Sequence, residues 1–131
     1  MTVVDRATRC IVAYEVCFER TPKLLQSVID AAPRASSYFS DAFNTYKELC
    51  YWGTHTAMSD KSETYSVEGV NADLRHYLAR LARKSRCFSR CIEALRRAVD
   101  LFVRCYNARQ LRKRKYPRYP AFITDALAPY V

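Results

Sequence analysis

The chain has 131 residues, half of them hydrophobic, and only two glycines. This length is enough for one packed core and too short for two ordinary domains, so we expect one domain or part of one. No run of about eighteen uncharged apolar residues occurs, and the N-terminus lacks the basic and then apolar layout of a secretory signal. We therefore expect a soluble cytoplasmic protein with no membrane partner.

Charge is distributed unevenly along the chain. Residues 1–70 contain seven Lys or Arg and nine Asp or Glu, a net charge of −2, whereas residues 71–131 contain fifteen and four, a net charge of +11. Such a cationic half favours a polyanion such as DNA as the partner. The alternative is a solvated helical surface that binds nothing.

Cysteine and histidine do not form a metal-binding pattern. The two histidines stand alone, and no Cys-x-x-Cys pair occurs among Cys10, Cys17, Cys50, Cys87, Cys91 and Cys105. Cys87 and Cys91 could share a helix face, but two thiols do not complete the tetrahedral shell of zinc. The pattern favours reduced thiols in the core.

The first elements in chain order are two strands and a helix. Residues 2–4 and 10–19 are rich in β-branched and aromatic side chains, which predicts two strands joined by a tight connection. Thr21 followed by Pro22 is typical of a helix start, and apolar residues at helical spacing continue the helix to Pro33.

Shorter elements are predicted next. Residues 37–40 predict a strand that ends at Asp41, before a short helix over 45–49 and a strand over 55–58.

The second half of the chain is predicted to be helical from Ser66, which we expect to cap the first helix. One apolar stripe comprises Leu74, Tyr77, Leu78 and Leu81, and a longer one comprises Phe88, Cys91, Ile92, Leu95, Val99, Phe102, Val103 and Tyr106. These stripes predict two packed helices. Past Gln110, a basic run and two prolines predict an extended arm.

Two carboxylates stand out by their positions. Asp41 ends a predicted strand, and Glu68 lies in the first turn of a predicted helix, on the face that holds Arg75. Strand ends and helix starts can meet over one edge of a sheet, so these two groups could act together. The alternatives are a turn-forming role for Asp41 and a favourable interaction of Glu68 with the helix dipole.

Three segments resemble the transposases of the insertion sequence one family. Residues 66–89, SVEGVNADLRHYLARLARKSRCFS, resemble the family's signature helix, whose pattern is close to E-x-x-N, then L-R-x-x-L-A-R-L-x-R-K, then F-S. Residues 38–46 resemble its segment of a strand, an aspartate and a tyrosine, and residues 3–13 resemble the hairpin between its second and third strands. The resemblance covers nearly the whole chain and weakens after Arg112.

The resemblance implies an α/β fold with a ribonuclease-H-like catalytic core and a helical C-terminal half. It also implies a prokaryotic DNA transposase that works near the nucleoid, cleaves the ends of an insertion element and joins them to target DNA. In this family two aspartates and a glutamate hold two divalent metal ions, Mg²⁺ or Mn²⁺. By position Asp41 matches the second acid and Glu68 the third. DNA contacts would come from Asn71, Arg75, Arg80, Arg83 and Lys84.

The family's first aspartate lies on a strand that precedes the hairpin of residues 3–13. Asp5 falls in the hairpin connection, where we expect a turn role. Residues 1–110 are therefore expected to form a partial catalytic domain without its first strand, and residues 111–131 a basic, proline-containing tail. A truncated copy, or a frame completed by frameshifting, would explain this pattern.

Two other functions remain open from the sequence. One is an inactive DNA-binding fragment that associates with itself or with a full-length transposase. The other, if the resemblance misleads, is a small basic RNA-binding protein.

Overall fold

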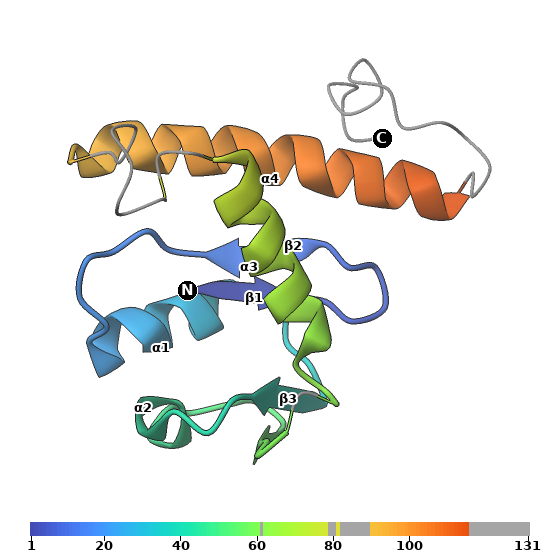
Figure 1. Ribbon diagram of the computed structural model, residues 1–131. Helices are drawn as coiled ribbons and strands as arrows, with labels where there is room; N and C mark the ends of the chain where they lie inside the picture. Colours follow the sequence, from blue (N-terminus) through green and yellow to red (C-terminus); the bar gives the residue numbers. More distant parts are fainter. Residues whose placement is uncertain (61, 79–80, 82–89, 116–131) are drawn as a thin grey trace.

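The computed structural model describes residues 1–60, 62–78, 81 and 90–115, which form a mixed α/β fold with a long C-terminal helix (Figure 1). The elements in chain order are β1 (Thr2–Val4), β2 (Ile11–Tyr14), α1 (Pro22–Ala31), β3 (Ser37–Ser40), α2 (Asn44–Lys47), β4 (Thr54–Ala57), α3 (Tyr65–Tyr77) and α4 (Ile92–Lys115). The predicted α/β class is confirmed. In these described residues, the strands form two separate two-stranded sheets rather than one larger sheet.

The first sheet is an antiparallel hairpin of β1 and β2, with one register shift between Val3 and Val4. Its connection places Arg9 at a φ of 61°, a left-handed conformation that costs energy for a residue with a Cβ. The Arg9 guanidinium is anchored by hydrogen bonds to the Ser66 and Tyr65 hydroxyls, at 2.6 and 2.9 Å. The strand predicted over 10–19 is correct only for its first part, because β2 ends at Tyr14.

The second sheet pairs β3 with β4 in parallel, from Ser37 opposite Thr54 to Ser40 opposite Ala57. The chain enters β4 through Gly53, where an added Cβ would lie 2.3 Å from the Ser36 carbonyl oxygen. Glycine is therefore required for this close approach of two backbones.

Helix α1 packs against the first sheet and against the segment that joins β3 to β4. Thr21 caps it, accepting a hydrogen bond from the Leu24 N–H at 3.3 Å, as its sequence predicts. Val28 packs against the first sheet, and Leu25 and Ile29 pack with Leu49 and with side chains that flank both sheets. A single apolar helix face thereby joins the first sheet to the segment between β3 and β4.

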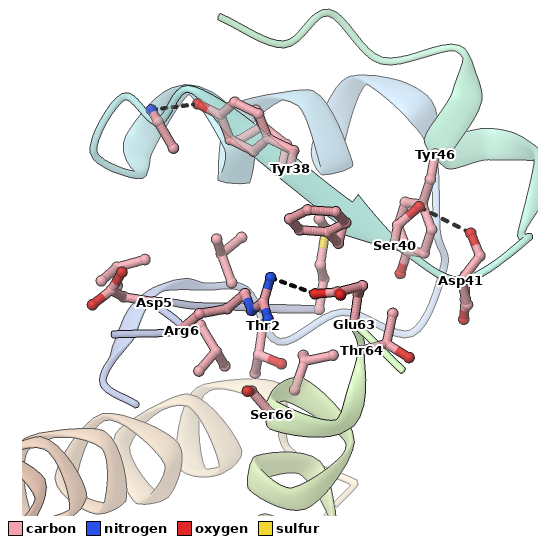
Figure 2. A pocket seen from close by; sticks show the side chains of 18 of the residues that line it. Thr2, Asp5, Arg6, Tyr38, Ser40, Asp41, Tyr46, Glu63, Thr64 and Ser66 are labelled. Carbon is pink, nitrogen blue, oxygen red and sulfur yellow. Dashed lines mark hydrogen bonds and ion pairs between the residues drawn. The ribbon is translucent and has the colours of Figure 1, made fainter. Parts of the chain in front are cut away.

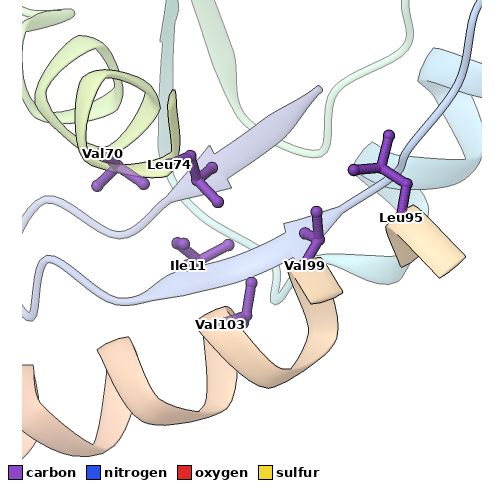
Figure 3. Close-up of a cluster of buried hydrophobic side chains, with 6 residues drawn as sticks. All are labelled: Ile11, Val70, Leu74, Leu95, Val99 and Val103. Carbon is purple, nitrogen blue, oxygen red and sulfur yellow. The ribbon is translucent and has the colours of Figure 1, made fainter. Parts of the chain in front are cut away.

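The largest core cluster lies where β2 meets α3 and α4. Its buried side chains are Ile11, Val70, Leu74, Leu95, Val99 and Val103 (Figure 3). The Asn107 amide adds two hydrogen bonds to Ile11, accepting from its N–H at 2.7 Å and donating to its carbonyl at 2.8 Å. Asn107 thus satisfies backbone groups on a strand edge that would otherwise lack partners.

Helix α3 differs from its prediction at both ends. It begins at Tyr65 after Thr64 as N-cap, so Ser66 lies inside the helix and is buried. Tyr77, which was expected in the apolar stripe, is the last residue of the helix and is 63% exposed.

Helix α4 is longer than expected, and its stripe is less buried. The arm predicted to be extended from residue 111 is helical through Lys115, because the prolines that disfavour helix come later, at 117 and 120. Cys91 is exposed although it was assigned to the stripe, and Cys50 is exposed as well, so the prediction of buried thiols holds for Cys10. Phe88 and Cys87 lie outside the described residues.

No helix in the described ranges is long and apolar enough to cross a membrane.

Leu95 and Leu101 provide a matched test of the core. Leu95 is buried against Ile11, whereas Leu101 on the same helix is 61% exposed. We expect Leu95→Ala to lower the free energy of unfolding by roughly 2–5 kcal/mol, and Leu101→Ala to change it by about 0.5 kcal/mol or less. Urea denaturation followed by circular dichroism measures both. Equal losses would show that α4 does not pack as described.

Candidate active site

A cleft of about 700 Å³ separates the two sheets. Its walls are β1, β3 and the start of α3, as Figure 2 shows for Thr2, Ser40 and Thr64. Of the residues predicted to form the site, this cleft is lined by Asp41, Glu68, Asn71 and Arg75. Arg80, Arg83 and Lys84 lie outside the described residues.

Asp41 directly follows β3 and is exposed at the cleft. Its carboxylate accepts a hydrogen bond from the Phe43 N–H at 3.1 Å, the arrangement of an aspartate-initiated turn. The turn-forming role weighed from the sequence is therefore present, and the exposed carboxylate has further lone pairs for a ligand.

Glu68 lies in the first turn of α3 and is half-buried. The Thr64 hydroxyl donates to its Oε1 at 3.4 Å, which holds the carboxylate beside the helix start. Asn71 and Arg75 follow at positions three and seven along the same helix face, which lines the cleft. The opposite face buries Val70 and Leu74 in the core. Helix periodicity therefore separates the cleft side chains from the core side chains.

Asn71 connects the helix to the first sheet. Its Oδ1 accepts a hydrogen bond from the Thr2 hydroxyl at 2.8 Å. This contact positions α3 against β1, a role that the sequence did not indicate. Arg75 is exposed and lines the cleft.

Asp5 has the predicted turn role. Its carboxylate accepts hydrogen bonds from the Thr8 N–H at 2.8 Å and the Thr8 hydroxyl at 2.6 Å. These bonds lower the pKa of Asp5. The Asp5 carboxylate is therefore engaged within the turn that connects β1 and β2.

Arg6 crosses the cleft, a feature that sequence analysis missed. It forms an ion pair with Glu63, and its guanidinium lies 5.1 Å from the centre of the Phe39 ring (Figure 2). No local pattern marks this contact, because it joins a turn residue to residues more than thirty positions away.

Ser40 and His55 form a second unpredicted pair, with Oγ and Nε2 at 2.8 Å. The Ser40 hydroxyl also donates to the Asp41 carbonyl at 2.9 Å. These contacts join the end of β3 to β4. Burial lowers the pKa of His55, and Tyr51 stacks on its ring at 4.2 Å.

The comparisons with known proteins define the class. A family model described as IS1 transposase matches residues 2–108. The chain therefore belongs to the IS1 transposase family, and it is an insertion-sequence transposase by descent, as the resemblance of its signature helix predicted. No curated protein and no solved structure matches the chain.

The burial of His55 predicts a pH dependence of stability. Burial lowers the pKa of His55 in the folded chain, so on acidification the unfolded chain takes up this proton first, near the ordinary value of about 6.5. Stability should therefore fall as the pH drops below about 6.5, and His55→Gln should reduce that fall. Urea denaturation between about pH 7.5 and 5.5 measures the difference. His76→Gln, at an exposed histidine, is the matched substitution for comparison. An unchanged pH profile in His55→Gln would contradict the described burial.

Proposed function

We propose that this chain provides part of the DNA-cleaving and strand-joining site of an IS1-type transposase, with Asp41 and Glu68 as two of its acidic ligands. The observation that carries the proposal is that a strand end and a helix start, distant in sequence, deliver both carboxylates to one cleft. Asp41 is exposed and Glu68 half-buried, so both are accessible from the cleft.

Carboxylate oxygens are the protein ligands that Mg²⁺ and Mn²⁺ prefer. Within the described residues, however, no group of three His, Cys, Asp or Glu side chains lies close enough to hold a metal ion. Asp41 and Glu68 therefore fit the chemistry of such a site but do not complete its ligand set. We propose that the active enzyme needs at least one further ligand beside them.

The proposed DNA partner suits the charge of α4. This helix carries eight Lys or Arg and two Asp or Glu, and all the acids lie in its first ten residues. Asp100 pairs with Arg104, which leaves the C-terminal part strongly cationic. A surface of this kind attracts the phosphates of insertion-element ends and of target DNA.

The finer fold assignment is also a proposal. An antiparallel hairpin, a covering helix, a parallel strand pair and then helices on the opposite side follow the order expected for a ribonuclease-H-like core. The family membership supports this assignment.

Transposition in cells tests the two carboxylates. For an insertion element that carries this reading frame, we expect Asp41→Asn and Glu68→Gln each to lower transposition by about 100-fold or more, since even outer partners of metal ligands are worth roughly 10–100-fold. Glu48→Gln, an exposed carboxylate that does not line the cleft, is the matched control. Normal transposition with Glu68→Gln, at equal protein abundance, would remove Glu68 from the site.

A second candidate is DNA binding without catalysis, favoured by the incomplete ligand set of the described residues. It predicts salt-sensitive binding of duplex DNA in the presence of a chelator, with equal affinity for the parent chain and Asp41→Ala. A gel-shift titration over several salt concentrations measures this. Structured RNA serves as competitor, and preferential binding of RNA would favour the RNA-binding alternative.

A further inference from the structure

A second groove lies between α3 and α4, on the side of α3 away from the candidate active site. It has a volume of about 390 Å³ and is lined from α3 by Asp73 and Tyr77. These two residues lie five and nine positions after Glu68, which at about 100° per residue places them on the opposite side of the helix. The groove is therefore a separate site, which the chemistry proposed for the cleft does not use.

Aromatic rings form one wall of this groove. The C-terminal end of α3 meets the middle of α4 (Figure 1), where Tyr77 lies beside Phe102, with ring centres 6.4 Å apart. The Phe102 ring in turn stacks on the Tyr106 ring at 5.6 Å. Phe102 and Tyr106 are half-buried, whereas Tyr77 is 63% exposed. This aromatic wall of Tyr77, Phe102 and Tyr106 therefore offers flat ring surface that is open to a ligand at Tyr77.

Two cations follow the aromatic wall along α4. Arg109 and Lys113 line the groove and are exposed. Among the described residues neither of them takes part in an ion pair, whereas Arg104 on the same helix pairs with Asp100. Within that part of the chain, Asp73 is the one acidic side chain in the lining. The positive charge of Arg109 and Lys113 is thus available to an anion.

We infer that this groove binds an unpaired base of a DNA strand. The base stacks on the aromatic wall at Tyr77, and the flanking phosphates contact Arg109 and Lys113. Aromatic faces next to cations are the combination by which proteins hold single-stranded nucleic acid, because every base has a π face and every linkage a negative charge. The inference goes beyond the proposed function, since it concerns DNA that is held away from the acidic cleft.

The lining of the groove favours an unpaired base over intact duplex. Ring faces inside a hollow are accessible to a base that has left its stack, whereas a duplex presents its backbone and base edges. Asp73 and Gln110 supply the polar groups of the lining. A carboxylate accepts hydrogen bonds from an exocyclic amino group, and an amide both donates and accepts, so this pair suits the edge of adenine.

A duplex with one bulged adenine tests the site. The matched probe carries an abasic residue in the bulge, so it keeps the same phosphates and lacks only the base. Affinity of the full chain for both probes is measured by fluorescence anisotropy in the presence of a chelator, so that metal ions do not contribute. We expect the adenine probe to bind about tenfold more tightly than the abasic probe, the size that stacking of one base gives.

Variants of Tyr77 separate stacking from general DNA binding. Tyr77→Ala should abolish the preference for the adenine probe, whereas Tyr77→Phe, which keeps the ring, should retain it. Phe18→Ala is the matched control, because Phe18 is an exposed ring, at 59%, that does not line the groove. It should keep the preference of the parent chain.

Variants of the two cations test the phosphate contacts. Arg109→Gln and Lys113→Gln should each weaken both probes to the same extent and reduce the slope of affinity against salt by about one. Lys23→Gln, at an exposed lysine on α1 outside the groove, should leave that slope unchanged.

Three results would each overturn the inference. The first is equal affinity of the parent chain for the adenine and abasic probes, and the second is an equal loss for both probes with Tyr77→Ala. The third is a dimer of the chain, detected by sedimentation, that dissociates with Tyr77→Ala, because a second copy would then occupy the groove. All binding is measured with a chelator, so these results do not depend on the metal site proposed at Asp41 and Glu68.

Discussion

The side chain of Ile11 packs between α3 and α4, and the position of the site depends on this contact. Val70 and Leu74 reach Ile11 from α3, and Val99 and Val103 reach it from α4. Two hydrogen bonds from Asn107 fix the Ile11 backbone from the α4 side. Since buried apolar side chains allow little rearrangement, α3 has one stable position over the hairpin. That position sets where the opposite face of the helix, with Glu68, lies.

A second constraint on the cleft comes from helix α1. One apolar face of helix α1 packs against Val3 of the first sheet and against Leu49 and Tyr51, which lie between β3 and β4. The cleft between the two sheets is lined by residues of β1, β3 and the start of α3. In α3, the side chains that line the cleft and the side chains packed in the core lie on opposite faces of the helix.

Local sequence patterns predicted most of the elements. Thr21-Pro22 marked the start of α1, and the run of β-branched and aromatic residues marked the hairpin, because capping and strand preferences act over a few residues. Errors fell at element ends, such as Ser66 and residues 111–115, and at Ser66 a contact from a distant residue contributes. Ser66, for example, accepts a hydrogen bond from Arg9.

The sequence by itself determined the family, the cationic second half and the spacing that puts Glu68, Asn71 and Arg75 on one helix face, since charge and periodicity are properties of a local segment. Tertiary structure alone decided that Asp41 and Glu68 line one cleft, that Arg6 crosses it, and that Asn71 bonds to Thr2. These contacts join residues far apart in the chain, and they depend on how α1, α3 and α4 pack around two short sheets. Packing of this kind follows from the whole set of buried side chains, which no single segment of the sequence contains.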